Sequence, residues 1–183
     1  MITSLPNLLT LFRIAVIPLM IAGFHLEPPL ANWLVLGLFA LAGVSDFFDG
    51  HIARLRGEVS NLGRFLDPVA DKLLVGATIL LLVYVDHIDG LTILPALVIL
   101  CREILVSGLR EFLADLRVSV PVSRLAKWKT TFQMMALGFL IVGNAAPAPI
   151  PAIEIGVVSL WIAAILTLYT GYDYLRAGAR HMT

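Results

Sequence analysis

The 183-residue sequence contains a single cysteine and few charged side chains. One thiol excludes an internal disulfide bond and a cysteine metal cluster, and because Cys101 lies in an apolar run we expect it to be a buried packing residue. Only 14% of the residues are charged, against about 25% in a typical soluble domain. The formal net charge is zero, and we expect no nucleic-acid partner.

The N-terminus also lacks the basic segment and cleavage site of a secretory signal. We therefore expect the first apolar segment to remain in the chain as a membrane helix.

Hydrophobic residues, in contrast, make up 59% of the chain, and the mean hydropathy is +0.92. A helix crosses the hydrocarbon core of a bilayer in about 20 apolar residues. Segments with breakers between them fit this length at Leu5–Leu26, Leu30–Arg54, Asp67–Val85, Leu91–Leu113, Val122–Val142 and Ile153–Tyr174. The pattern predicts one all-α domain over residues 1–183, an integral membrane bundle of six transmembrane helices. These runs are longer than the core of a soluble helical bundle needs, which disfavours that alternative.

Charge is segregated between the two sets of connections. The second-to-third connection, the fourth-to-fifth connection and the C-terminal tail carry most of the lysines and arginines. The three opposite connections carry none and hold Glu27, Asp86, Asp89 and Glu154 instead. By the positive-inside rule, both termini and both basic connections are expected in the cytoplasm.

Four carboxylates lie close to the cytoplasmic ends of two neighbouring spans. Asp46 and Asp49 are three residues apart, and Asp67 and Asp71 are four apart, so each pair projects from one helix face. An ionisable residue within a membrane helix costs about 2.5–3.5 kcal/mol on insertion scales, and four acids together also repel one another. Their oxygen atoms suit a hard cation, and the cluster therefore predicts a site for Mg²⁺ or Mn²⁺.

Small and basic residues accompany these acids. Gly50 and Ala53 leave room for a large flat group against the helix, and Gly63 could do the same from the opposite side. Arg54 could hold a phosphate in a bidentate manner.

Two structural alternatives apply to the acids. The four aspartates could form a purely structural ion-pair network with Arg54, Arg64 and Lys72, at considerable cost near a membrane. Asp67 could also cap a helix that begins at Pro68, a role that does not exclude metal binding.

The run from Asp46 to Asp71 reads D-x2-D-G-x2-A-R-x8-G-x3-D-x3-D. This pattern resembles the signature of the CDP-alcohol phosphotransferases, a family with six membrane helices. Residues 5–13, 67–73, 102–111 and 127–134 are also similar to one branch of that family, the bacterial phosphatidylglycerophosphate synthases.

The resemblance implies that the phosphatidyl group of CDP-diacylglycerol is transferred to glycerol 3-phosphate, giving phosphatidylglycerophosphate and CMP. It also implies two divalent ions, Mg²⁺ or Mn²⁺, held by the four aspartates, with Asp71 as the general base. The residues expected to contact CDP are Asn7, Thr10, Asp46, Gly50, Ala53, Arg54, Gly63 and Asp67. For Asn7 and Thr10, helix capping and packing is the alternative. The expected location is the bacterial cytoplasmic (inner) membrane, with the active site facing the cytoplasm and a homodimer possible.

A phosphorylated acceptor requires a second basic pocket. Arg102 lies about halfway along its span, so it must face a cavity or pair with Glu103, an aspartate or a phosphate. We expect Arg102, Arg110, Lys127 and Lys129 to bind the acceptor phosphate, with Arg110 and Lys127 favoured over the others. The alternative for each is anchoring at the level of the lipid headgroups.

Other functions remain open. The acceptor could be inositol phosphate, serine or phosphatidylglycerol, although the basic fourth and fifth helices disfavour serine. A divalent-cation transporter would need matching acids in the outer halves of the spans, and the sequence has no such cluster. A non-catalytic assembly protein would have no use for four acids at this spacing.

Overall fold

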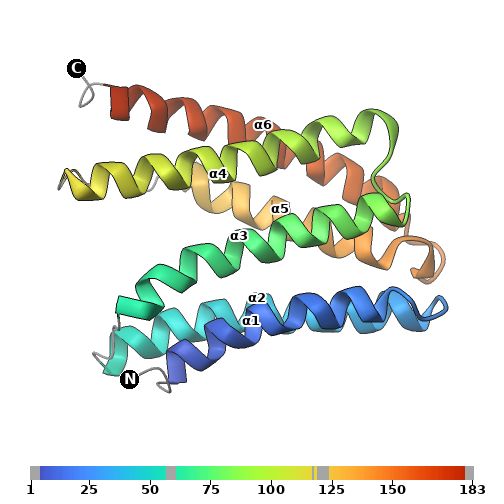
Figure 1. The fold of residues 1–183 in the computed structure, drawn as a ribbon. Helices are drawn as coiled ribbons and strands as arrows, with labels where there is room; N and C mark the ends of the chain where they lie inside the picture. Colours follow the sequence, from blue (N-terminus) through green and yellow to red (C-terminus); the bar gives the residue numbers. More distant parts are fainter. Residues whose placement is uncertain (1–4, 57–60, 117, 119–123, 180–183) are drawn as a thin grey trace.

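The computed structural model describes residues 5–56, 61–116, 118 and 124–179. These residues form six α-helices and two short 3-10 helices, with no strand among them (Figure 1). The helices are α1 (Leu5–Gly23), α2 (Leu30–Arg56), α3 (Asn61–Tyr84), α4 (Ile93–Asp115), α5 (Arg124–Val142) and α6 (Ala152–Ala179), with η1 (Gly90–Thr92) before α4 and η2 (Gly143–Ala145) after α5. The all-α prediction is confirmed, and each predicted span corresponds to one helix.

The bundle consists of two halves of three helices. In the first half, α1 packs against both α2 and α3; in the second, α6 packs against both α4 and α5. Figure 1 shows α1 and α2 on one side of the bundle and α4 and α6 on the other. Contacts of α3 with α4 and α5, and of α2 with α5, join the halves. The site described below lies at this junction.

Apolar side chains fill the interior and also cover much of the outside. Leu82, Ile99 and Leu140 belong to a core cluster that is closed to solvent, whereas Leu80 and Ile165 are largely exposed. Such exposed apolar surface is unusual for a soluble protein. It suits an environment of lipid.

Two helical segments, Gly90–Ala114 and Ala152–Arg176, are long and apolar enough to cross a membrane, and Asn7–Gly23 and Leu30–Asp46 are shorter apolar helices. That all six helices cross a membrane stays a prediction. Cys101 was predicted to be buried, and this is wrong, because its face of α4 is exposed. An apolar run in a membrane helix does not require that every side chain packs against protein.

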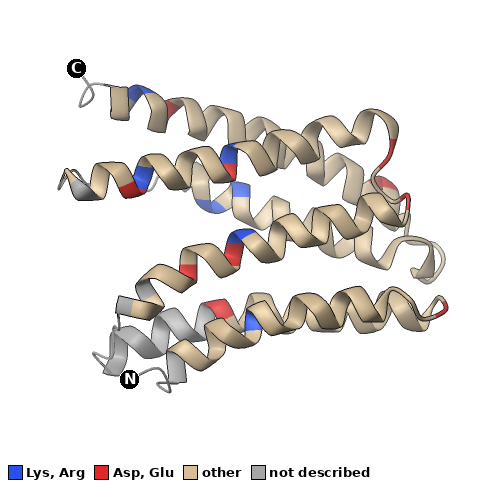
Figure 2. Ribbon diagram, in the orientation of Figure 1, with Lys and Arg blue, Asp and Glu red and all other residues tan. Residues whose placement is uncertain are grey.

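Basic side chains gather at one end of the bundle. Figure 2 shows the lysines and arginines of the described residues in the half where α1 begins and α6 ends, whereas the loops at the opposite end carry acidic residues. The first residue of α1 and the last of α6 lie at this same end (Figure 1). The segregation seen in the sequence is therefore a spatial one.

The start of α3 differs from the prediction. The helix begins at Asn61, so Asp67 and Pro68 lie inside it and Asp67 is not its N-cap. The physical reason is that the Asp67 carboxylate is engaged by side chains of α1. Pro68 removes one backbone donor within the helix, and its own carbonyl accepts a hydrogen bond from Lys72 Nζ at 2.7 Å.

Candidate active site

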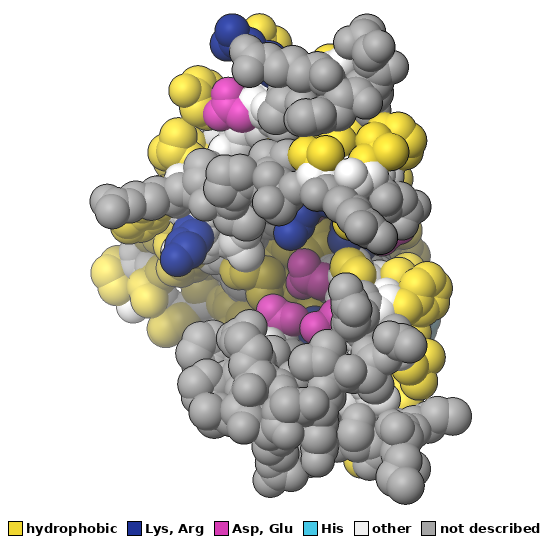
Figure 3. Space-filling model, turned by 90° about the vertical axis from the view of Figure 1, so that its left-hand side faces the viewer, with side chains coloured by type: hydrophobic (Ala, Val, Ile, Leu, Met, Phe, Trp, Pro, Cys, Tyr) yellow, Lys and Arg dark blue, Asp and Glu magenta, His cyan; other side chains and the backbone are white. Residues whose placement is uncertain are grey.

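A cavity of ≈ 400 Å³ opens at the junction of the two halves. The first half contributes Asp46, Asp67, Pro68, Asp71 and Lys72, and the second half contributes Arg102, Glu103, Val106, Arg110, Ala126, Lys129, Thr130 and Tyr174. Figure 3 looks onto this end of the molecule and shows acidic and basic side chains gathered around a hollow. One half thus presents mainly carboxylates to the cavity, and the other presents mainly cations.

The acidic side is organised by a polar face of α1. Asn7, Thr10 and Arg13 follow one another at intervals of three residues, and all three are buried. Arg13 Nη1 donates to Asp46 Oδ1 at 2.5 Å, and Arg13 Nη2 donates to Asp67 Oδ1 at 2.6 Å. Thr10 Oγ1 also donates to Asp67 Oδ1, at 3.1 Å. Residues of α1 therefore hold together one carboxylate from α2 and one from α3.

Arg13 is a site residue for which the sequence prediction named no role. Its side chain is fully buried, whereas the Asp46 and Asp67 side chains are 51% and 44% exposed. A charged residue within an apolar run must find a partner, and this rule could have indicated Arg13 from the sequence. The alternative of an ion-pair network is thus realised in part, with Arg13 as a cation instead of the predicted Lys72.

The donor set fits a hard divalent cation. Its atoms are carboxylate oxygens, and Arg13 shows that a positive charge is held between Asp46 and Asp67. Asp71 lines the same cavity. Within the described residues, no three acidic, histidine or cysteine side chains converge as a ligand set. The side chains of Asp49, Ala53 and Arg54, and the surroundings of Gly50, lie outside the described part, so the full predicted set stays a prediction.

The remaining residues predicted to contact CDP lie near this acidic side. Asn7 and Thr10 are buried on α1, and Gly63 lies in the first turn of α3. Thr10 joins Asp67 directly.

On the basic side, Arg102 is fixed by α6. Its Nη2 donates to Thr170 Oγ1 at 3.0 Å, and its guanidinium carbon lies 6.0 Å from the centre of the Tyr174 ring, within the range of a cation–π contact. A Cβ at Gly171 would lie 3.1 Å from Arg102 Cγ, so the glycine makes room for the side chain. The prediction that Arg102 faces a cavity or pairs with Glu103 is met in both respects, since Nη1 lies 3.7 Å from Glu103 Oε1.

The other predicted basic residues divide into two groups. Lys129 is buried and donates to Glu103 Oε1, and Arg110 lines the same cavity as Lys129. Lys127 is exposed and lines a neighbouring shallow pocket on α5 with Ala126. The structure therefore brings Arg102, Arg110 and Lys129 together and leaves Lys127 apart.

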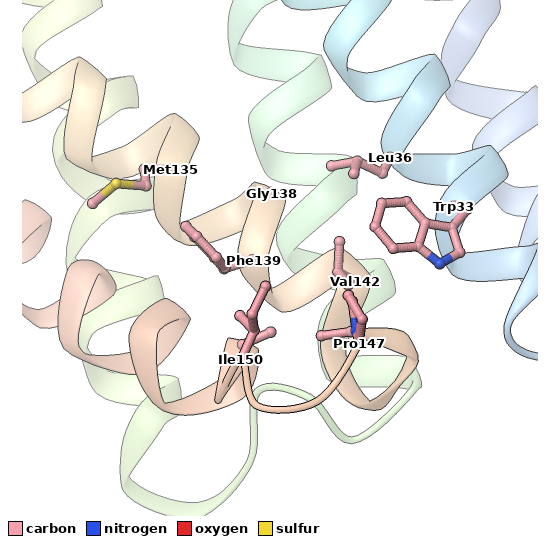
Figure 4. Close-up of a pocket in the computed structure, with 10 residues that line it drawn as sticks. Trp33, Leu36, Met135, Gly138, Phe139, Val142, Pro147 and Ile150 are labelled. Carbon is pink, nitrogen blue, oxygen red and sulfur yellow. The ribbon is translucent and has the colours of Figure 1, made fainter.

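A second cavity, of ≈ 350 Å³, lies near the opposite end between α2 and α5 (Figure 4). Its lining is apolar and consists of Trp33, Leu36, Met135, Gly138, Phe139, Val142, Ala146, Pro147, Ile150 and Ala152. These side chains offer no group for acid–base chemistry, metal binding or phosphate binding. The charged cavity is thus the candidate active site.

Comparison with known proteins identifies a family for this chain. A family model described as CDP-alcohol phosphatidyltransferase matches residues 3–169. A protein of Rickettsia felis is 52% identical over 174 residues, covering 95% of this chain and 94% of its own length. A protein of Pectobacterium atrosepticum is 44% identical over 181 residues (97% and 96%), and one of Haemophilus influenzae is 41% identical over 175 residues (94% and 92%). All three are named CDP-diacylglycerol–glycerol-3-phosphate 3-phosphatidyltransferase.

Proposed function

The chain belongs to the CDP-alcohol phosphatidyltransferase family, and we propose that it transfers the phosphatidyl group of CDP-diacylglycerol to glycerol 3-phosphate, releasing CMP. The observation that supports this most is the single cavity that joins carboxylates of α2 and α3 to cations of α4 and α5. A reaction between a nucleotide-activated lipid and a phosphorylated alcohol needs both kinds of group side by side. The relatives named for this reaction match nearly the whole chain.

The acidic side would hold the activated donor. The ligands of two divalent ions, Mg²⁺ or Mn²⁺, would be Asp46, Asp49, Asp67 and Asp71. When bound, such ions supply positive charge for the pyrophosphate and for the leaving oxygen. Arg13 and Thr10 hold the carboxylates of facing helices in place before the donor arrives. The CDP moiety would lie toward Gly50, Ala53 and Gly63.

The basic side would hold the acceptor. Arg102, Arg110 and Lys129 converge on the cavity and would bind the phosphate of glycerol 3-phosphate through charge-assisted hydrogen bonds. Asp71, across the same cavity, would take the proton of the attacking hydroxyl. The acceptor oxygen then forms a bond to the phosphorus that carries diacylglycerol, the bond from that phosphorus to the CMP oxygen breaks, and CMP leaves with the bonding electrons.

We also propose a location in the bacterial cytoplasmic membrane. The bundle exposes apolar side chains along its length, and its cations gather at the end that holds the cavity (Figure 2). By the positive-inside rule this end would face the cytoplasm, and the water-soluble acceptor would enter the cavity from that side. The other five α-helices of the described residues would accompany α4 across the bilayer as one multi-pass domain.

The reaction is tested with purified protein in detergent, CDP-diacylglycerol and Mn²⁺ or Mg²⁺, following CMP release. Release should require both the metal and glycerol 3-phosphate. Release with inositol phosphate instead would keep the family and change the acceptor. No release with any acceptor, from protein with a cooperative thermal transition, would contradict the proposed reaction.

The role of Asp71 is tested with Asp71→Asn, which keeps the side-chain shape and removes the basic oxygen. Turnover should fall by at least about 100-fold, the usual contribution of a general base, while CMP still raises the thermal transition of the variant. A near-normal rate would remove Asp71 from the role of base. Glu111→Gln, the same kind of change at an exposed position of α4, is the control.

A further inference from the structure

Glu103 places a carboxylate within the basic side of the cavity. Lys129 Nζ donates to Glu103 Oε1, and Arg102 Nη1 lies 3.7 Å from the same oxygen. The side chains of Arg102, Glu103 and Lys129 are only 10%, 17% and 8% exposed. The proposed function gives this carboxylate no task. A negative charge beside a phosphate site weakens phosphate binding, so the presence of Glu103 there calls for an explanation.

One consequence of Glu103 concerns the charge on the basic side of the cavity. Arg102, Arg110 and Lys129 carry three positive charges, and Glu103 reduces their sum to two. This sum matches a phosphate monoester dianion. The carboxylate therefore leaves the basic side of the cavity complementary in charge to such a ligand.

A second consequence concerns the free oxygen of the carboxylate. Both contacts of Glu103 go to Oε1, and no hydrogen bond found among the described residues uses Oε2. Glu103 lines the cavity. Its Oε2 is not one of the buried side-chain atoms that lack a hydrogen-bond partner among the described residues. An ionised carboxylate only accepts hydrogen bonds. Oε2 can therefore bind a ligand group only if that group is a hydrogen-bond donor. A phosphate dianion offers none, whereas an alcohol hydroxyl does.

We propose that Glu103 determines acceptor specificity by accepting, at Oε2, a hydrogen bond from the hydroxyl of the acceptor that does not react. The inference rests on the proposed function and narrows its substrate class. The acceptor is a phosphate monoester that carries two hydroxyl groups: one gives its proton to Asp71 and attacks, and the other binds Glu103. Arg102 and Lys129 hold the carboxylate in place through Oε1 and bind the acceptor phosphate with their remaining donors.

The test pairs two acceptors with two proteins. Glycerol 3-phosphate and 3-hydroxypropyl phosphate share the phosphate and a primary hydroxyl, but the second compound lacks the middle hydroxyl. The ratio of their kcat/KM values, measured by CMP release, reports the contribution of that hydroxyl. For the wild-type protein we expect a ratio of about 10 to 100 in favour of glycerol 3-phosphate, the value of one hydrogen bond to a charged group. In Glu103→Gln the ratio should fall at least about fivefold, because a neutral amide accepts a weaker bond.

A purely structural role gives a different result. If Glu103 only supported Lys129, then Glu103→Gln would lower kcat/KM for both acceptors equally and leave the ratio unchanged. The ratio is internal to each preparation, so partial misfolding of a variant cancels. Glu111→Gln, on the same helix and outside the cavity, is the matched control and should keep the wild-type ratio.

Each outcome bears on a distinct claim. A wild-type ratio near one overturns the role of Glu103 without any variant, and an unchanged ratio in Glu103→Gln does the same. No turnover of either acceptor by well-folded wild-type protein contradicts the proposed function itself. Turnover of glycerol 3-phosphate with a ratio near one therefore removes only the inference on Glu103.

Discussion

Replacing Arg13 with methionine tests whether a buried cation holds the acidic side of the site together. The change keeps an unbranched side chain similar to the aliphatic part of arginine, and it removes the charge-assisted hydrogen bonds to Asp46 at 2.5 Å and to Asp67 at 2.6 Å. Removing one partner of a fully buried ion pair costs about 3–5 kcal/mol. Here the two carboxylates are 51% and 44% exposed and can be rehydrated once the guanidinium is gone. Their exposure reduces the expected loss to about 1–3 kcal/mol.

The assay is thermal unfolding of the purified protein in detergent with a chelator. For a chain of this size, 1 kcal/mol corresponds to about 2–4 °C, so Tm of Arg13→Met should fall by about 2–12 °C. Lys72→Met is the matched control, because Lys72 lines the same cavity but donates to the Pro68 carbonyl oxygen of its own helix. Its Tm should fall by less than about 2 °C, as for a surface substitution.

Added Mn²⁺ makes the test more specific. If the acidic cluster binds a divalent cation, the ion supplies the charge that the variant lacks, and binding to the folded state raises its stability. Mn²⁺ should then raise Tm of Arg13→Met more than Tm of the wild type. An unchanged Tm of Arg13→Met in chelator, or a decrease no larger than that of Lys72→Met, would refute the view that Arg13 joins α1 to α2 and α3.

Two further substitutions test close contacts made by glycines. Gly171→Ala places a methyl group 3.1 Å from Arg102 Cγ, so the guanidinium must shift. KM for glycerol 3-phosphate should rise about tenfold, whereas KM for CDP-diacylglycerol should change little. Equal changes in both KM values would contradict a local effect on the acceptor side. Gly143→Ala adds a Cβ at a residue with φ of +50°, and this Cβ would lie 2.2 Å from Cε1 of His87. The change should cost about 1–3 kcal/mol of stability, measured as a lower Tm. An unchanged Tm would show that the loop adapts without strain.

The helices could be predicted from sequence because their determinants are local. Apolar run length and the breakers between runs define six segments, and the helices agree with them within a few residues at most ends. The exception is α3, which begins at Asn61 and not at Asp67. A proline after an aspartate is the local pattern of a helix start. That local preference lost to a tertiary interaction, because the Asp67 carboxylate binds Arg13 and Thr10 of another helix.

Burial was less predictable, for a reason that applies to helices in lipid. In water, an apolar residue in a helix is usually on the buried face. In a membrane, both lipid and protein neighbours are apolar, and so hydrophobicity alone does not distinguish the two faces. Cys101 lies in an apolar run and is exposed, whereas Asn7 and Thr10 are polar and buried.

The site itself shows the same division between local and tertiary information. Asp67 and Asp71 are one helical turn apart, so sequence spacing alone places them together. Arg102 is different: the cost of a charge in lipid predicts that it has a partner, but not which one. Its partner Thr170 is 68 residues away, on another helix, and nothing in the sequence connects the two positions. Only the packing of α4 against α6 makes this contact. Substitutions at the α6 residues that hold Arg102 should therefore alter the use of the acceptor, although they leave the spacing of the acids on α2 and α3 unchanged.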